Sequence, residues 1–483
     1  MRMNRRLFLK ALGVGAGALT LSQVLGWGQQ PPVKIGLIGP IDLLDVGRAM
    51  VRGAQLALEE INKLVDEKKL PPPKLTMDGL IRDDQVLRGD VARAAFEELV
   101  VEKGAQVIVG GFLDEAVMGM MPSMARLKKP FLNTGTSGKQ FSEMVRSDYA
   151  TYKYYFRLML NSEVLAQDAV GMVKGLMKEE LGVQKVALVM EDSNFGRDFL
   201  KLLQERLTTE AGVQVARAIN FPINNPDFNA ILQQIGDSDA DAIIPGFAFN
   251  TGVPFVGQTY ELKADAPVIG IITEGQAFEY WRSTGGRVMG HAYADAATGE
   301  TPLTPKTLPF YQAYVERYGD SPPSRPLYTA FTTYDGLFII KDAIDRAKGT
   351  DPDKLVEELE KTDYVGTVGR LQFRDKNDIY PHDPKYGPDY VVAKWVLWTT
   401  LAKDPLKANP QKDPLRVVIW PKQYRLRADA EGKPVSIDAC ISKAAAEYRA
   451  AVEDWKKKNK PKGGRFEAWQ TFARSAAKCF MGQ

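Results

Sequence analysis

The chain has 483 residues, of which 45% are hydrophobic and 25% charged, values typical of a globular protein long enough for two or more domains. Its formal net charge is +3, but the first 28 residues carry four basic side chains and no acid, so the remainder has a net charge of −1. Without an overall positive charge the folded part does not attract polyanions, and we expect no nucleic-acid partner.

Residues 1–28 have the pattern of an export signal. The pair Arg5-Arg6 is followed by Phe8, Leu9 and an apolar stretch over 11–25, which is shorter than the ~20 residues that span a membrane. This arrangement predicts a twin-arginine signal and a periplasmic or otherwise extracytoplasmic protein, with an N-terminal membrane anchor as the alternative.

From residue 33 onward, short apolar runs alternate with helical patterns. The runs "VKIGLIGP", "PKLTMDGLIRDD", "AQVIVGG" and "KKPFLNTGTSG" are separated by segments with helical spacing, and the same order returns between "VQKVALVMEDSNFG" and "APVIGIITEG". Alternating strands and helices favour parallel sheets covered on both faces, so we expect two α/β units of similar build. Near the C-terminus, "YVVAKWVLWTT" and "PLRVVIWPK" predict a β-hairpin.

The segment 130–138, "PFLNTGTSG", places glycines and hydroxyls at the end of an expected strand, where ligands bind in such sheets. A phosphate loop would need Ser or Thr after Gly138-Lys139, but Gln140 stands there. A nucleophile elbow would need glycine in place of Lys139. What remains is a turn whose backbone N–H groups and hydroxyls suit a carboxylate or another small polar group, with a plain structural turn as the alternative.

Histidine is too scarce for most hydrolytic chemistry. The chain has two histidines, His291 and His382, and His382 in "YPHDPKYGP" suits a loop better than a base. We therefore expect no catalytic residues, no cofactor and no metal site, and treat an α/β enzyme as the less favoured hypothesis.

Several segments in fixed order resemble one family. They are "IGLIGPIDLLDVGRAMVRGAQLALEEIN", "IRDDQVLRGDVARAAFEELVVEKGAQVIVGG", "KVALVMEDSNFGRDFL" and "GTVGRLQF", over about 33–375. The chain thereby resembles the substrate-binding proteins of ABC transporters for branched-chain amino acids and related ligands. That resemblance implies the type I periplasmic binding fold: two Rossmann-like α/β lobes with parallel sheets, joined by a multi-crossover hinge. The expected division is an export signal at 1–28, lobe 1 at 33–156 and 292–368, lobe 2 at 157–291 and 369–425, and a C-terminal helical extension at 426–483.

The resemblance also implies a ligand site between the lobes. By position, Gly135, Thr136 and Ser137 would hold a ligand carboxylate, and Glu274 would accept the ligand ammonium. The loop after the third strand reads Phe112-Leu113-Asp114-Glu115 where the family often has a serine.

Acids in that loop would repel a carboxylate unless they point away, or they would suit a cationic substrate such as an amide or polyamine. On the second lobe Phe195 would stack on the ligand, and either Phe247 or Phe249 would stand for the family's tyrosine.

The predicted function is an extracytoplasmic solute-binding protein that closes on a small amino-acid-like or amide-like ligand. It would act as a monomer and deliver the ligand to an ABC permease in the inner membrane, with a ligand-sensing receptor subunit of the same fold as the alternative. In an oxidising compartment Cys440 and Cys479, the two cysteines of the chain, could form a disulfide, with two free thiols as the other reading.

Overall fold

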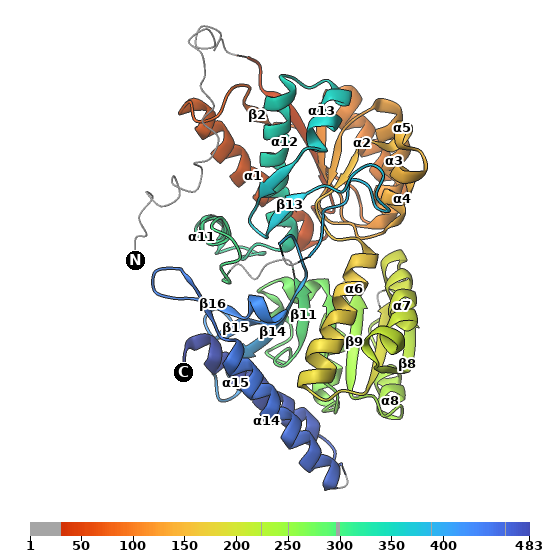
Figure 1. The fold of residues 1–483 in the computed structure, drawn as a ribbon, viewed down its shortest axis with the longest axis vertical. Helices are drawn as coiled ribbons and strands as arrows, with labels where there is room; N and C mark the ends of the chain where they lie inside the picture. Colours follow the sequence, from red (N-terminus) through yellow and green to blue (C-terminus); the bar gives the residue numbers. More distant parts are fainter. Residues whose placement is uncertain (1–29, 224, 250, 296–299, 388, 459) are drawn as a thin grey trace.

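The computed structural model describes residues 30–483 except 224, 250, 296–299, 388 and 459, so the expected export signal lies outside the described residues. Two α/β lobes lie one above the other in Figure 1, and the last two helices lie against the lower lobe. No helix in the described part of the chain is both long and apolar enough to cross a membrane.

The first lobe is built on a six-stranded sheet with the order β2-β1-β4-β5-β6, and β3 pairs with β1 beyond the end of β2. All its strand pairs are parallel, as the alternating pattern predicts. Its strands are β1 (Val33–Gly39), β2 (Leu75–Thr76), β3 (Ile81–Asp83), β4 (Val107–Gly110), β5 (Phe131–Asn133) and β6 (Tyr155–Arg157). Its helices are α1 (Asp45–Asp66), α2 (Gly89–Glu97), α3 (Asp114–Leu127), α4 (Gln140–Ser147), α5 (Tyr149–Tyr152), α11 (Thr307–Tyr318), α12 (Tyr328–Ala347) and α13 (Pro352–Leu359).

The close packing of α1 on α12 shows why this lobe includes a late segment of the chain. A Cβ atom at Gly53 of α1 would lie 2.3 Å from the carbonyl oxygen of Ala330 in α12, so only glycine permits this approach. The hydroxyl of Thr329 donates to the carbonyl of Val46 across the same interface (2.7 Å). Helix α12 is therefore an integral part of the first lobe's core.

The second lobe has a seven-stranded sheet with the order β15-β14-β11-β10-β9-β7-β8. The pairs from β8 to β11 are parallel, and β14 and β15 continue the sheet as the antiparallel hairpin that the sequence predicts. Its strands are β7 (Lys185–Glu191), β8 (Gln214–Phe221), β9 (Ala242–Phe247), β10 (Ile269–Ile272), β11 (Ala292–Asp295), β14 (Lys394–Thr400) and β15 (Pro414–Trp420). Its helices are α6 (Ser162–Met172) with the π-helical continuation η4 (Val173–Glu180), α7 (Asn194–Arg206), α8 (Asn229–Gly236), α9 (Gly252–Glu261) and α10 (Tyr280–Ser283).

Strand β11 corrects one expected boundary. The sequence division began the return to the first lobe at residue 292, but β11 pairs with β10 on one side and β14 on the other. Its four residues are all buried within the second sheet, because each face of a central strand is covered. The chain crosses between the lobes after β6, after β11 and after the small hairpin of β12 (Asp363–Val365) and β13 (Arg370–Gln372).

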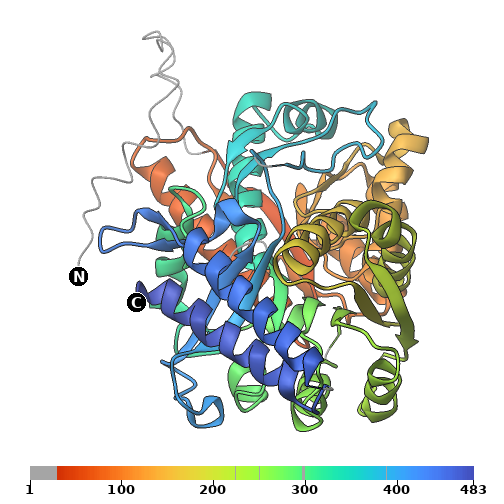
Figure 2. The same cartoon turned by 60° about the horizontal axis from the view of Figure 1, so that its bottom comes forward.

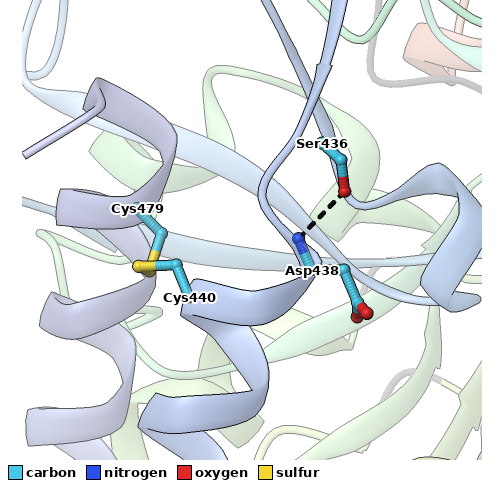
Figure 3. Close-up of a disulfide and its surroundings, with 4 residues drawn as sticks. All are labelled: Ser436, Asp438, Cys440 and Cys479. Atoms are coloured by element: carbon cyan, nitrogen blue, oxygen red, sulfur yellow. Dashed lines mark hydrogen bonds between the residues drawn. A yellow bond between two sulfur atoms is a disulfide. The ribbon is translucent and has the colours of Figure 1, made fainter.

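The C-terminal extension contains a short hairpin and two helices, β16 (Leu426–Ala428), β17 (Pro434–Ser436), α14 (Asp438–Lys457) and α15 (Gly464–Met481). The two helices run antiparallel side by side against the second lobe (Figures 1 and 2). The hydroxyl of Thr399 in β14 donates to the carbonyl of Ala473 in α15 (2.6 Å). A disulfide joins Cys440, near the start of α14, to Cys479, near the end of α15 (Figure 3).

Candidate functional site

A cavity of about 830 Å³, its open mouth included, lies between the two lobes. The loops that follow β4 and β5 form much of the first-lobe wall of the cavity. The loops that follow β7, β9 and β10 form much of the second-lobe wall, and residues near the crossovers line the rest. The lining residues are Phe112, Leu113, Asp114, Glu115, Gly135, Ser137 and Tyr328 from the first lobe, Ser193, Phe195, Ala248, Ile271, Thr273, Gln276, Ala294 and Asp295 from the second, and Met159, Leu160, Leu165, Val391, Val392 and Ala393 near the crossovers.

A pair of glycines turns the chain from β4 into this cavity. Gly110 and Gly111 have φ values of 122° and 80°, and a Cβ at Gly110 would lie 2.0 Å from the carbonyl oxygen of Ile38. Only glycine fits such a position. The pairing of β4 with β1 stops at this turn. The four residues from Phe112 to Glu115 therefore lie at the carboxyl edge of the sheet, where α3 begins.

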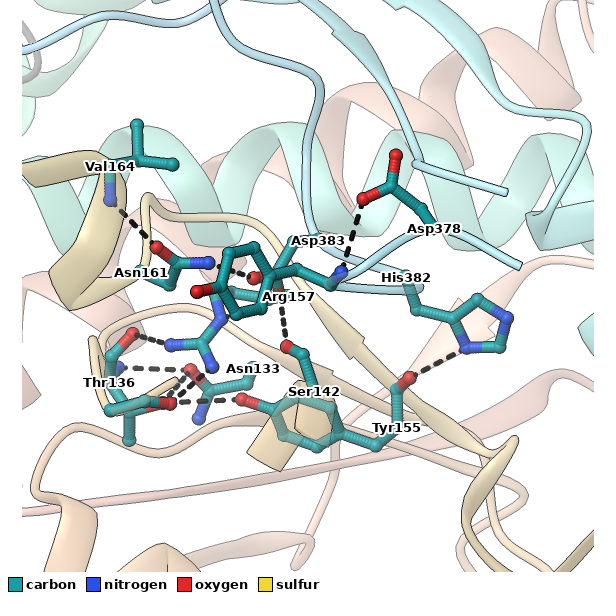
Figure 4. Close-up of polar contacts among 12 residues, drawn as sticks. Asn133, Thr136, Ser142, Tyr155, Arg157, Asn161, Val164, Asp378, His382 and Asp383 are labelled. Atoms are coloured by element: carbon teal, nitrogen blue, oxygen red, sulfur yellow. Dashed lines mark hydrogen bonds and ion pairs between the residues drawn. The ribbon is translucent and has the colours of Figure 1, made fainter. Parts of the chain in front are cut away.

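Arg157, the last residue of β6, holds the neighbouring loop (Figure 4). Its buried guanidinium donates to the carbonyls of Thr136 (2.8 Å) and Gly138 (2.6 Å). The Thr136 hydroxyl contacts the side-chain oxygen of Asn133 (2.8 Å) and the hydroxyl of Tyr155 (3.3 Å), so it points into the lobe. Gly135 and Ser137 line the cavity, whereas the Thr136 side chain does not. This placement corrects the expectation that both hydroxyls face the ligand.

The other side of Arg157 is held by the segment that follows β13. Asp383 accepts hydrogen bonds from Arg157 Nε (2.8 Å), Ser142 Oγ (2.5 Å) and Asn161 Nδ2 (2.7 Å) (Figure 4). Asn161 also caps α6, because its side-chain oxygen accepts from the Val164 N–H (2.8 Å). One buried carboxylate thus ties the first lobe to the start of the second lobe's first helix.

Asp114 is buried and lines the cavity, and it belongs to the same polar cluster. Its Oδ1 accepts the N–H of Gly138 (3.1 Å), so the side chain bridges the two first-lobe loops. Burial raises its pKa to about 6, an effect opposed by the Gly138 hydrogen bond and the nearby Arg157 guanidinium.

Glu115 reaches across the cavity to the second lobe. Its Oε1 accepts the N–H of Asn194, the first residue of α7 (3.2 Å). A carboxylate at a helix N-terminus is electrostatically favourable, so this contact links the lobes in the arrangement seen here.

The second lobe presents a cap, an aromatic ring and an amide to the cavity. Ser193 caps α7 by accepting from the Gly196 N–H (3.0 Å), and the ring of Phe195 stacks on Phe199 with centroids 5.4 Å apart. Gln276 donates through Nε2 to the carbonyl of Ala294 (2.9 Å), while its buried Oε1 has no hydrogen-bond partner among the described residues.

Glu274 lies beside the main cavity, in a second one that shares Phe112, Ala248 and Thr273 with it. Its Oε2 accepts the N–H of Gly252 at the start of α9 (2.6 Å). Burial raises its pKa to about 7, and the negative charge of Glu191 adds to this rise.

The two phenylalanines expected at the second-lobe strand end lie elsewhere. Phe247 is fully buried among Phe221, Phe228 and Phe255, with ring centroids 4.9, 6.0 and 5.1 Å away. Phe249 is also buried, and neither ring lines the cavity. The alternation of side chains at the end of β9 turns Phe247 to the core face, which corrects the expectation of a ligand-facing aromatic there.

Sequence reasoning missed the apolar residues near the crossovers and the start of α12. Tyr328 lies at the cavity, and its hydroxyl donates to the carbonyl of Gly135 (2.9 Å). Met159 and Leu160 follow β6 after one intervening residue, and Val391 to Ala393 directly precede β14. The position of Met159 and Leu160 near the expected lobe boundary at 156/157 was a usable signal, because residues at crossovers between lobes also border the cleft.

The charged side chains among the described residues that line the main cavity are all acidic. Among the described residues that line it, Asp114, Glu115 and Asp295 are acidic and none is lysine or arginine. Asp295 is neutralised by an ion pair with the buried Arg416. No group of three or more potential metal ligands occurs in the described part of the chain.

Comparison with known proteins agrees with this geometry. The family described as periplasmic binding protein matches residues 32–384. A Leu/Ile/Val-binding protein homologue from Brucella abortus (strain 2308) is 24% identical over 385 residues, 75% of this chain and 87% of that relative.

Solved structures share the fold. A branched-chain amino acid transporter substrate-binding protein from Streptococcus pneumoniae, in complex with isoleucine, has a TM-score of 0.65 at 19% identity and covers 81% of this chain and 100% of its own. A solute-binding protein from Rhodopseudomonas palustris BisB5, in complex with 3,4-dihydroxybenzoic acid, has a TM-score of 0.62 at 21% identity, with coverages of 76% and 93%.

The family match spans both lobes and ends before β14. It confirms the expected fold class and the absence of catalysis, and it implies an extracytoplasmic location. The chain therefore belongs to the periplasmic binding protein family.

Proposed function

We propose that this protein binds a small amino-acid-like or amide-like solute in the inter-lobe cavity and closes around it by a hinge motion. The observation that carries this proposal is the cavity itself, which is lined by both lobes and by residues near the crossovers. A ligand that contacts both lobes stabilises their closed arrangement, so binding shifts the population toward it. Related proteins are solved with small ligands that range from isoleucine to 3,4-dihydroxybenzoic acid.

The closed form would act as a monomer and would then be recognised by an ABC permease in the inner membrane.

We infer twin-arginine export from Arg5-Arg6. Replacing both arginines by lysine should keep the protein out of the extracytoplasmic fraction, whereas unchanged fractionation would contradict this route.

The direct test is to identify the solute. We expect native mass spectrometry of the freshly purified protein to show a bound small molecule that is released on denaturation. An Ala248→Phe variant, which fills the space shared by the two cavities, should lose that molecule. The control is Ala446→Phe, at an exposed position of α14, which should retain it. Absence of any binding to the native protein would contradict the proposed function.

A further inference from the structure

Three helices have their N-termini at the two connected cavities: α3, α7 and α9. A helix N-terminus attracts anions, and a ligand carboxylate would ordinarily be held by such N–H groups. In this protein α7 and α9 already donate their first N–H to a protein carboxylate, and α3 carries two acidic residues in its first turn. Asp114 and Glu115 occupy the first turn of α3, Glu115 accepts the first N–H of α7, and Glu274 accepts the first N–H of α9.

Backbone N–H groups of the loop after β5 also donate to acceptors within the protein. The N–H groups of Thr134, Thr136 and Gly138 donate to the carbonyl of Gly110, the side chain of Asn133 and the carboxylate of Asp114, respectively. Gly135 and Ser137 line the cavity together with Asp114, and their N–H groups have no hydrogen-bond acceptor among the described residues. A ligand carboxylate placed there would face two protein carboxylates, and no lysine or arginine is among the described residues that line this cavity. Arg48 lines the adjoining cavity, and the Arg157 guanidinium lies behind the loop, where it is bound to the carbonyls of Thr136 and Gly138.

A separate observation concerns the second lobe. Gln276 is 7% exposed and lines the cavity, and its Oε1 has no hydrogen-bond partner among the described residues. The orientation of the amide is fixed, because turning it over would set its oxygen against the carbonyl oxygen of Ala294. A buried acceptor without a donor is costly unless a ligand supplies the donor.

We propose, given the solute-binding function proposed above, that the ligand enters this cavity with an N–H-bearing head group, an ammonium, amidinium or primary amide, and without a carboxylate at that end. The head donates to Gln276 Oε1 and lies near the carboxylates of Asp114 and Glu115. The apolar body lies against residues such as Phe195, Ile271 and Leu165.

The test uses the full-length mature protein and two matched probe series. The aliphatic series is 3-methylbutylamine, 3-methylbutanamide and 3-methylbutanoate, and the aromatic series is benzylamine, benzamide and benzoate. Ligand-observed NMR titration should give dissociation constants at least tenfold lower for the amine or amide than for the carboxylate in at least one series. Equal or tighter binding of both carboxylates, or no binding of either amine or amide, would overturn the proposal.

Gln276→Met removes the free acceptor with little change in volume. It should weaken amine or amide binding at least tenfold and leave carboxylate binding unchanged. Gln470→Met is the matched control, because Gln470 is equally buried (8% exposed), donates to the carbonyl of Met289, and lies on α15 away from the cavity. Equal losses in both variants would contradict the assignment of Gln276. Analysis of the molecule released from denatured wild-type protein separates the two proposals. A released molecule with a carboxylate at its head, an α-amino acid included, overturns only this one, whereas no released molecule and no bound probe overturns solute binding as well.

Discussion

The guanidinium of Arg157 and the carboxylate of Asp383 form an ion pair of 2.8 Å, with side chains 0% and 2% exposed. Arg157 ends the last strand of the first lobe's sheet, and Asp383 lies in the segment that returns the chain to the second lobe. The same guanidinium holds the two carbonyls of the cavity loop, so the shape of the binding site depends on a contact between distant parts of the sequence.

Asp383→Ala should therefore destabilise the protein by about 3–5 kcal/mol, because it leaves a buried guanidinium without its counter-charge. Urea unfolding would measure this loss. The control is Asp454→Ala, which breaks the exposed pair between Asp454 (60% exposed) and Lys458 (67% exposed) and should cost less than about 0.5 kcal/mol. A similar small change for both variants would show that Asp383 is not essential to the cluster.

Loss of the Glu115 contact should favour an open arrangement of the lobes. Glu115→Ala removes the acceptor for the Asn194 N–H, a charge-assisted hydrogen bond between the lobes. We expect a larger radius of gyration for the ligand-free protein in small-angle X-ray scattering. Glu143→Ala on α4 of the same lobe should leave the scattering curve unchanged, and an unchanged curve for both variants would sink the idea.

Truncation of two phenylalanines should distinguish a core residue, whose loss lowers stability, from a cavity residue, whose loss weakens binding. Phe247→Ala should lower the free energy of unfolding by about 3–5 kcal/mol, because it opens a hole in the aromatic cluster. Phe195→Ala should cost clearly less stability, since the ring is only partly buried, and should instead weaken binding of the native solute. Equilibrium unfolding and calorimetric titration of both variants test the two assignments, and a reversed pattern would contradict them.

The free energy of unfolding should depend on pH through Glu274. Its pKa in the folded protein is raised to about 7, so between the unfolded value and pH 7 the folded state holds more protons than the unfolded state. Stability from this group therefore falls as pH rises through about 4.5 to 7, with a slope of at most about 1.4 kcal/mol per pH unit.

Glu274→Gln should remove this contribution, which urea unfolding at several pH values would measure. Glu453→Gln is a control of opposite sign, because a hydrogen bond from Lys456 lowers the pKa of Glu453. An identical pH profile for wild type and Glu274→Gln would refute the prediction.

The disulfide should stabilise the extension without affecting the cavity. It closes a loop with a sequence separation of 39, for which chain entropy predicts about 4 kcal/mol or less. A Cys440→Ser/Cys479→Ser variant should unfold at lower temperature but bind the native solute unchanged, since no described residue beyond Ala393 lines the main cavity. A large loss of affinity would instead connect the extension to the site.

Local patterns in the sequence were enough to determine the fold class. Apolar runs alternating with helical spacing predict both parallel sheets, and the paired runs after residue 390 predict the antiparallel hairpin of β14 and β15. The segment 130–138 also marked the correct edge of the first sheet, because turn residues that follow a buried strand define its carboxyl end.

Which side chains face the cavity was decided only by the tertiary structure. Thr136 and Ser137 are adjacent and equally polar, yet one hydroxyl binds within the lobe and the other side chain lines the cavity, because Arg157 fixes the loop by its carbonyls. Phe247 turns to the core through its register in β9, and β11 joins the second sheet through its pairing with β14. These outcomes depend on contacts between residues far apart in the chain, and a local pattern in the sequence carries no information about such contacts.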